Sequence, residues 1–152
     1  MANRKPTLDD LFSEEGALCR TPEETVQLGA DLAVTLVPPV VVSLEGTLGA
    51  GKTQLTKGLV AGLGSESEAS SPSFAIIHEY AGASCPIFHF DFYRLDEATE
   101  LINAGYDDCL AEGVTIAEWG DKFPEMLPDG TFRLRFEIMP DDTRRIRGVR
   151  TL

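Results

Sequence analysis

The sequence predicts an α/β fold, arranged as a three-layer sandwich with a mostly parallel central sheet and an antiparallel hairpin or edge. Two patterns carry this prediction. An apolar, β-branched run at 40–44 leads through a glycine-containing turn at 46–51 into a helical repeat that begins at Lys52. An unbroken apolar strand is typical of a sheet that helices cover on both faces. Later in the chain, strand-like runs at 74–80 and 87–92 flank a short turn, which predicts an antiparallel hairpin.

Length and composition predict one domain over residues 1–152. Hydrophobic residues make up 43% of the 152 and charged residues 25%, which is usual for a globular protein and argues against a disordered or fibrous one. No repeat, low-complexity segment or linker composition divides the sequence. The three cysteines lie far apart and form no C-x-x-C motif, which disfavours a disulfide framework and a structural zinc site.

Charge and hydropathy exclude further classes. The net charge is −12 at pH 7, from 25 acidic residues against 13 lysines and arginines. Such a surface repels phosphate backbones and disfavours non-specific binding to nucleic acid. No stretch approaches the roughly 18–20 apolar residues of a membrane span, and no apolar segment near the start has the form of a signal peptide. We therefore expect a cytoplasmic protein.

The first half of the chain predicts three helices around the strand at 40–44. Residues 8–15 have a short helical pattern that a glycine ends. Thr21 begins a second helix as the first residue of a capping box, and Pro38-Pro39 stops it. A third helix runs from Lys52 to near Gly64. The residues expected on the buried faces of the two longer helices are Leu28, Leu32, Leu36, Leu55, Leu59 and Leu63.

The second half predicts mostly strands. A polar, serine-rich loop at 65–73 precedes the hairpin. Alternation of apolar and charged residues over 131–138 is typical of a half-exposed strand. The other expected elements are a helix at 96–104, a short turn at 107–111, a strand at 114–117, a turn at 127–130 and a last strand within 141–152.

Residues 46–53 match the phosphate-binding motif G-x-x-x-x-G-K-[ST]. The glycines let the backbone wrap with its N–H groups pointing inward, and the helix that follows adds its positive N-terminal end. Lys52 supplies a mobile charge for the β- and γ-phosphates, and the Thr53 hydroxyl can bind Mg²⁺. The motif lies after an apolar strand and before an amphipathic helix, as this chemistry requires. It predicts nucleotide binding.

A phosphate-binding loop that hydrolyses nucleotides also needs a carboxylate at the end of a neighbouring strand, to hold the metal or to orient water. Asp91 and Glu118 each follow a predicted strand and are the candidates. His89 interrupts the first of these runs and Thr115 the second. The spacing alone allows either acid to take either role.

The remaining polar residues are interpreted as structural. His78 and His89 lie on apolar strands and are expected to be core histidines with their hydrogen bonds satisfied. Trp119 is expected to pack, although an indole there could also meet a partner protein. Arg94 is expected to pair with neighbouring acids. The acidic residues expected on a solvated face are Asp96, Glu97, Glu100, Asp107 and Asp108.

The ordered motifs GTLGAGKT, SPSFAIIHEY, HFDFYRL and VTIAEWGD resemble those of the TsaE family, ATPases of bacterial tRNA threonylcarbamoyladenosine synthesis. The segment TPEETVQLG resembles the start of that family's N-terminal helix. The likeness covers roughly residues 21–119 and is fainter beyond them. It implies a magnesium-dependent ATP site and a weak intrinsic ATPase activity. The implied partners are TsaD and TsaB proteins, which modify the adenosine next to the tRNA anticodon, so the chain would meet tRNA only through that complex.

The resemblance also implies roles for individual residues. Thr53 and Glu118 would bind Mg²⁺, and Lys52, Asp91 and Glu118 would serve hydrolysis. Ser73 would belong to a nucleotide-responsive loop, and Trp119 would lie near the site or the partner. The chain departs from the family at Thr47, where Asp is usual, and at Ser73, where Thr is commoner. The residues that would hold the nucleotide are Leu48, Gly49, Ala50, Gly51, Lys52 and Thr53, with Thr21, Thr25 and Arg144 as candidates near the base.

Other functions share the same loop. A small-molecule kinase would need arginines to clamp the transferred group, and between Lys52 and Thr131 the sequence has one arginine, Arg94. A GTPase is disfavoured because no N-K-x-D motif follows the loop. A nucleotide-gated adaptor, in which ATP occupancy alone sets partner affinity, uses the same residues as an ATPase and stays open.

Overall fold

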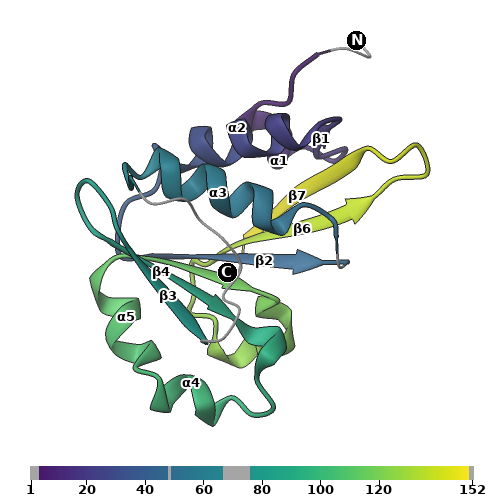
Figure 1. Ribbon diagram of the computed structural model, residues 1–152. Coiled ribbons are helices and arrows are strands. Elements are labelled where there is room, and N and C mark those ends of the chain that lie inside the picture. The colour runs from purple at the N-terminus through teal and green to yellow at the C-terminus, as the bar shows by residue number, and fades with distance from the viewer. Residues whose placement is uncertain (1–3, 48, 67–75, 151–152) are drawn as a thin grey trace.

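The computed structural model describes residues 4–47, 49–66 and 76–150 and contains a seven-stranded mixed sheet of order β1-β7-β6-β2-β5-β4-β3 (Figure 1). Helices lie on both faces of this sheet, so the predicted α/β class is confirmed. No helix in these described ranges is long and apolar enough to cross a membrane. The strands are β1 (Ala17–Cys19), β2 (Val40–Gly46), β3 (Ile77–Ala81), β4 (Pro86–Asp91), β5 (Val114–Glu118), β6 (Phe132–Ile138) and β7 (Arg144–Arg150).

The centre of the sheet is parallel and its two sides are antiparallel. Strand β2 pairs in parallel with β5 and β6, and β5 pairs in parallel with β4. The pairs β3–β4, β6–β7 and β1–β7 are antiparallel. The sheet is therefore more mixed than the mostly parallel one expected. Because β2, β4 and β5 run in the same direction, their carboxyl ends meet at one edge of the sheet.

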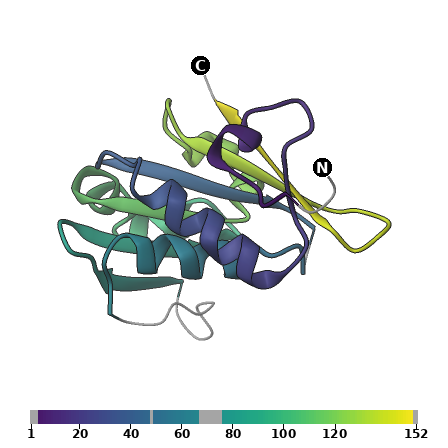
Figure 2. The same ribbon diagram turned by 90° about the horizontal axis from the view of Figure 1, so that it is seen from above.

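Two long helices, α2 (Pro22–Ala33) and α3 (Lys52–Gly62), lie side by side on one face (Figure 2). They approach closely because a glycine of one helix faces the backbone of the other. A Cβ built on Gly58 of α3 would lie 1.9 Å from the carbonyl oxygen of Val26 in α2. Hydrophobic side chains of the sheet fill the space beneath them. The core on this face includes Leu28, Leu32, Val42, Leu44, Leu55, Leu59, Ile87, Val114, Ile116, Leu134, Phe136 and Ile146.

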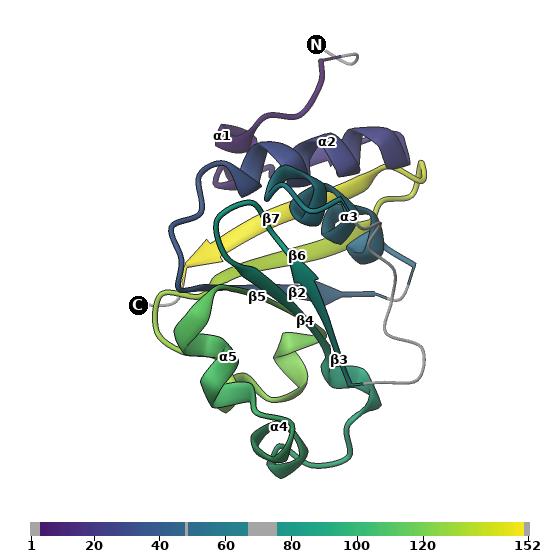
Figure 3. The ribbon, with the colours of Figure 1, turned by 60° about the vertical axis from the view of Figure 1, so that its left-hand side comes forward.

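The opposite face carries a second, smaller core under α4 (Thr99–Asn103) and α5 (Tyr106–Glu112) (Figure 3). The ring of Tyr106 lies edge-on to Phe90 and Phe92, at centroid distances of 5.1 and 5.8 Å, and its hydroxyl donates to the Met126 carbonyl at 2.9 Å. Three short 3₁₀ segments complete this side: η1 (Phe92–Arg94), η2 (Gly120–Lys122) and η3 (Pro124–Met126).

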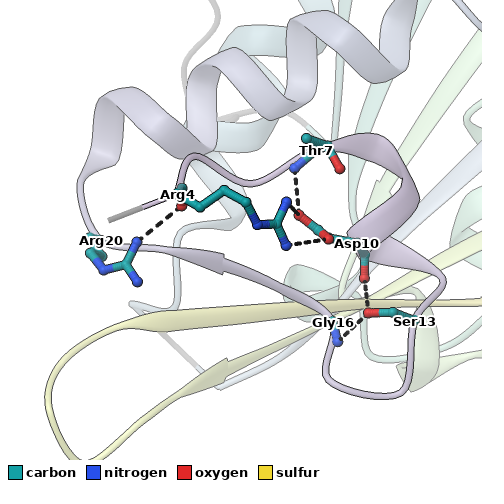
Figure 4. A network of polar contacts seen from close by, with 6 residues as sticks. All are labelled: Arg4, Thr7, Asp10, Ser13, Gly16 and Arg20. Carbon is teal, nitrogen blue, oxygen red and sulfur yellow. Dashed lines mark hydrogen bonds and ion pairs between the residues drawn. The ribbon is translucent and has the colours of Figure 1, made fainter. Parts of the chain in front are cut away.

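Polar contacts hold the N-terminal segment in shape, and Arg20, which follows β1, donates to the Arg4 carbonyl at 3.2 Å (Figure 4). The Arg4 guanidinium donates to both oxygens of Asp10 at 3.1 and 2.9 Å, and the Thr7 N–H donates to Asp10 Oδ2 at 2.8 Å. The Arg4 pair lowers the pKa of the Asp10 carboxyl. The Gly16 N–H donates to Ser13 Oγ at 3.1 Å, and β1 begins directly after it.

Several elements differ from the expected ones. Helix α1 spans only Leu8–Leu11, strand β1 was not expected, and the predicted turn at 107–111 is helix α5. Strand β3 begins at Ile77, while residues 74–75 of the predicted strand lie outside the described residues. Strand β4 ends at Asp91, and Phe92 already belongs to η1. The hairpin, the strands at 40–44 and 114–117, and a last strand within 141–152 are confirmed.

Candidate functional site

The loop between β2 and α3 is shaped by glycines with left-handed backbone conformations. Gly49 has φ of 80° and Gly51 has φ of 102°, values that side chains other than glycine rarely tolerate. Gly51 is the N-cap of α3 and provides no side-chain cap, so the first-turn N–H groups lack that partner. Helix N-termini of this kind attract anions. Ala50 lies within the loop and is buried, whereas Leu48 lies outside the described residues.

Lys52 is the first residue of α3 and folds back against the loop. Its Nζ donates to the carbonyl oxygens of Gly46 at 2.8 Å and Thr47 at 2.9 Å. The same nitrogen lies 4.1 Å from the centroid of the Trp119 ring. Only 6% of the residue is exposed, and this burial lowers the pKa of the ammonium group although Glu118, Asp121 and Asp91 act in the opposite direction. The lysine charge is thus held inside the site by two carbonyl oxygens and an aromatic ring, with nearby carboxylates that also favour its charged form.

Asp91 and Glu118 lie side by side at the same edge of the sheet. They are direct partners across the parallel strands β4 and β5, each as the last residue of its strand. Asp91 is 8% exposed and Glu118 4%. Burial raises the pKa of the Asp91 carboxyl, while its hydrogen bond from the Tyr93 N–H, at 3.0 Å, opposes the rise. The expectation that both acids end strands is confirmed; Glu118 ends β5, which neighbours the loop strand β2, whereas Asp91 ends β4, one strand further away.

A cavity of about 940 Å³ joins the loop to both acids. Its volume falls in the usual range for ligand pockets. Toward β1 and β7 it reaches Thr21, Thr25 and Arg144, and toward η1 it reaches Tyr93 and Arg94. The predicted site residues that line it are Thr21, Thr25, Gly49, Gly51, Lys52, Thr53, Asp91, Glu118 and Arg144.

The three residues predicted near the nucleotide base also have structural roles or are buried. Thr21 caps α2 by accepting from the Glu24 N–H at 3.1 Å. Thr25 is 1% exposed, so its side chain can offer little surface to a ligand. Arg144 donates to the carbonyl and the carboxylate of Asp142, at 2.6 and 2.8 Å, and its side chain is 26% exposed. Ser73, expected in a nucleotide-responsive loop, lies outside the described residues.

The structure adds aromatic residues that sequence reasoning assigned to packing or did not consider. Tyr93 is 62% exposed, and its ring centroid lies 5.0 Å from that of Trp119. Trp119 adopts a left-handed conformation, with φ of 60°, directly after Glu118. Such a conformation is uncommon for a bulky residue and is concentrated at functional sites. The adjacency of Trp119 to a strand-end acid was the signal available in the sequence.

The histidines differ from one another. His78 Nδ1 lies 3.2 Å from the Tyr80 hydroxyl, so it has the expected partner, but it is half-buried on the edge strand β3 rather than in the core. His89 is fully buried, yet neither of its ring nitrogens has a hydrogen-bond partner among the described residues. The expectation that His89 is satisfied within the core is therefore wrong. Its Nε2 lies 3.5 Å from Glu118 Oε2, which places it beneath the strand-end acids. Arg94 lies 3.4 Å from Asp91, the pairing that was expected.

The oxygen atoms at this edge of the sheet suit a hard divalent cation. Glu118 Oε1 is buried and has no hydrogen-bond partner among the described residues, so it is an acceptor that remains to be satisfied. The Thr53 hydroxyl and the Asp91 carboxylate line the same cavity. No group of three or more His, Cys, Asp or Glu side chains among the described residues could by itself hold a metal ion. This pattern fits Mg²⁺, which usually binds one or two protein oxygens together with phosphates and water.

Comparisons with known proteins agree in family and fold. Residues 19–146 match the family model TsaE, described as threonylcarbamoyl adenosine biosynthesis protein TsaE. The chain is 38% identical over 126 residues to the tRNA threonylcarbamoyladenosine biosynthesis protein TsaE of Bacillus subtilis, covering 82% of this chain and 78% of that protein. It is 34% identical over 128 residues to the protein of the same name from Treponema pallidum, covering 84% and 94%.

A solved structure is also similar. The crystal structure of Bacillus subtilis YdiB superposes on the chain with a TM-score of 0.68 at 33% sequence identity. The match covers 85% of this chain and 80% of that one. The family match over residues 19–146 spans both the loop and the strands that carry the acids.

Proposed function

The chain belongs to the TsaE family of threonylcarbamoyl adenosine biosynthesis proteins, and we propose that within that pathway it binds and hydrolyses ATP with Mg²⁺. One observation supports this proposal most. A loop with the phosphate-binding sequence, the lysine that follows it and two strand-end carboxylates all line one cavity. In this proposal the fold is that of a phosphate-binding-loop nucleotide hydrolase, and the activity is placed in the cytoplasm, where its tRNA pathway would operate.

The loop and α3 would hold the phosphates. Backbone N–H groups at the glycine turn and in the first turn of α3 would donate to phosphate oxygens. Lys52 would exchange its bonds to the Gly46 and Thr47 carbonyls for the β- and γ-phosphates, which are stronger acceptors for an ammonium group. Helix α3 has 11 residues, long enough for its N-terminal field to contribute.

Thr53 and the two acids would bind the metal ion and activate the attacking water. Thr53 and Glu118 would hold the magnesium ion, directly or through water, and the ion when bound would neutralise charge on the phosphate oxygens. Asp91 would orient the attacking water and accept its proton. Burial raises the pKa of this carboxyl, which makes it a better proton acceptor than an ordinary aspartate. Trp119 and Tyr93 would cover the cavity on the η1 side.

The proposed partners are TsaD-like and TsaB-like proteins, and tRNA would be met only through their complex. The net charge of −12 agrees with a subunit that acts on proteins rather than on the tRNA backbone. Weak hydrolysis by the isolated chain and faster hydrolysis in the complex are the expected behaviour. A binding assay between the chain and those proteins, with and without ATP, tests this part separately.

Product analysis tests the proposal against the kinase alternative. Phosphate released to water should require Mg²⁺ and should fall by about a hundredfold or more in Lys52→Ala and Glu118→Gln, as expected when a group that stabilises the transition state is removed. Release that is undiminished in both variants, or transfer of the phosphate to an acceptor molecule, would overturn it.

A non-hydrolysable ATP analogue tests it against the adaptor alternative. If hydrolysis is the functional step, the analogue should support at most one cycle of tRNA modification by the reconstituted complex. Full multi-turnover modification with the analogue would show instead that occupancy of the site is sufficient.

A further inference from the structure

His89 is a buried polar residue that the proposed reaction does not yet use. It lies on β4 two residues before Asp91, so both side chains point to the same face of the sheet. Its exposed fraction is 0%, and that of Glu118 is 4%. The distance between His89 Nε2 and Glu118 Oε2 is 3.5 Å. The imidazole therefore lies directly under the carboxylate that we place at the metal.

The surroundings make this contact unusual for a core histidine. Neither His89 nitrogen, nor Glu118 Oε1, has a hydrogen-bond partner among the described residues. A buried polar group without a partner destabilises the folded state, so a histidine at this position is unfavourable unless it acts on something. An aliphatic residue would pack between these strands at lower cost. The Glu118 carboxylate, whose Oε2 lies 3.5 Å from His89 Nε2, is the acceptor that could offset this cost.

We propose that His89 is a positioning residue whose Nε2–H donates to Glu118 Oε2 and turns the other oxygen, Oε1, toward the metal site. This inference rests on the proposed function. A carboxylate that is hydrogen-bonded on one oxygen loses rotational freedom, so less entropy remains to be lost when the second oxygen binds a cation. The contact at 3.5 Å would close by about half an ångström to become a hydrogen bond of ordinary length. Glu118, rather than Asp91, is thereby assigned to the metal.

The side chains of glutamine and asparagine separate this role from simple packing. The amide nitrogen of glutamine can occupy the place of Nε2 and donate to Glu118, whereas asparagine is too short to reach it. His78, the cross-strand neighbour of His89, provides the matched control because it lies on the same sheet but bonds to Tyr80. The set of variants is therefore His89→Gln, His89→Asn and His78→Asn, each checked for folding by its thermal midpoint.

The first measurement is isothermal titration of a non-hydrolysable ATP analogue at a series of Mg²⁺ concentrations. Its readout is the Mg²⁺ concentration at which the effect on the affinity for the analogue is half-maximal. His89→Asn should raise this midpoint about tenfold or more, which is the usual cost of losing a partner behind a metal ligand. His89→Gln and His78→Asn should stay near the wild-type value. Equal midpoints in His89→Gln and His89→Asn would overturn the assignment. A wild-type protein without any Mg²⁺-dependent affinity would instead contradict the proposed function.

The second measurement does not depend on nucleotide. The chain has two histidines, so ¹⁵N spectra of the imidazoles resolve each, and His78→Asn identifies the His78 signals. The proposal requires Nε2 of His89 to carry a hydrogen in the folded protein. A spectrum in which Nε2 is the unprotonated nitrogen would overturn it even if the His89 variants do not fold.

Discussion

The ammonium nitrogen of Lys52 lies 4.1 Å from the centroid of the Trp119 ring. Nothing in the motif requires this contact, because it joins the phosphate-binding loop to the residue after a strand-end acid. A cation over an indole face gains about 0.5–2 kcal/mol, more when water is excluded. The ring therefore helps to hold a buried charge in place before any phosphate arrives. In the proposed function, a bound nucleotide would draw the ammonium group from this ring toward phosphate oxygens.

Tryptophan fluorescence should report that exchange, since Trp119 is the single tryptophan of the chain. Lys52→Met removes the charge beside the ring while keeping a similar shape. The emission of the ligand-free variant should differ from that of the ligand-free wild type, because a nearby cation perturbs the excited indole. Adding ATP and Mg²⁺ should shift the wild-type emission and leave that of the variant nearly unchanged. Identical ligand-free spectra would remove the contact from the account.

Asp91→Asn should stabilise the protein at neutral pH. Burial raises the pKa of the Asp91 carboxyl above its ordinary value of 3.8, so the ionised form disfavours the folded state at any pH above the raised value. Asparagine removes that cost and keeps an oxygen for the Tyr93 N–H. The pairing with Arg94 that is lost has a half-exposed partner and contributes little.

The stability difference between Asp91→Asn and the wild type should depend on pH. Below about pH 3.8 the carboxyl is protonated in both the folded and unfolded chains, so the variant and wild type should then be equally stable. The advantage of the variant should appear as pH rises from 3.8 through the raised value and persist at pH 7. Thermal unfolding between pH 3 and 8 checks it. A wild type that is more stable than the variant at pH 7 would mean that the carboxylate is stabilised by contacts beyond those described.

A buried ion pair between the loop strand β2 and its neighbour β6 should matter for stability. Glu45 is 1% exposed and accepts two hydrogen bonds from Arg133, at 2.6 and 2.9 Å, and one from Ser43, at 2.9 Å. Glu45→Ala leaves the guanidinium without its partner and should cost roughly 3 kcal/mol of unfolding free energy. Urea denaturation measures it.

The control for this prediction is an ion pair on the neighbouring strands. Glu137 pairs with Arg145 at 2.6 Å, but its side chain is 51% exposed. Glu137→Ala should therefore cost less than about 1 kcal/mol. Comparable losses in the two variants would show that burial does not distinguish the pairs.

The glycine contact between α2 and α3 predicts an unusual helix substitution. Alanine normally stabilises a helix by about 1 kcal/mol relative to glycine. At Gly58 the added methyl would meet the Val26 carbonyl oxygen at 1.9 Å and force the helices apart. Gly58→Ala should therefore lower the unfolding free energy by about 2 kcal/mol despite the gain in propensity.

Thermal unfolding of two variants tests whether the close contact at Gly58 outweighs the gain in helix propensity. About 2 kcal/mol corresponds to a drop of roughly 4–8 °C in the midpoint for a domain of this size. The reverse change at an exposed position of the same helix, Ala61→Gly, should cost only the propensity difference, about 1 kcal/mol. A higher midpoint for Gly58→Ala than for the wild type would show that the helices can separate without loss.

The local parts of this fold could be read from the sequence because their signals are local. The helix start at Thr21, the apolar run at 40–44 and the glycine loop each predict an element from adjacent residues, and the structure has a helix, a strand and a loop at these places. Of the expected capping box, it shows the bond from the Glu24 N–H to the Thr21 hydroxyl. Strand β1 has only three residues and is defined by pairing with β7, more than a hundred residues later, so its own composition carried no signal. Helix α5 begins after a left-handed glycine, Gly105, and was too short and acidic to show an apolar stripe.

The same distinction between local and long-range signals applies to the functional site. Neighbouring residues identified the loop, and the position of Asp91 and Glu118 at strand ends identified the acids. The contacts between distant segments were out of reach: Lys52 with Trp119, His89 with Glu118, and Glu45 with Arg133 at a separation of 88 residues. They depend on the order of strands in the sheet, which pairing decides and a single sequence does not display.

The central claim is that this cavity holds ATP together with Mg²⁺, and isothermal titration of the purified chain with a non-hydrolysable ATP analogue tests it most directly. The account predicts saturable binding of one analogue per chain, tighter with Mg²⁺ than with a chelator present, and lost in Lys52→Ala while the thermal midpoint of that variant stays within a few degrees of the wild type. Binding that Lys52→Ala leaves intact, or no binding by the wild type with Mg²⁺ present, would contradict it.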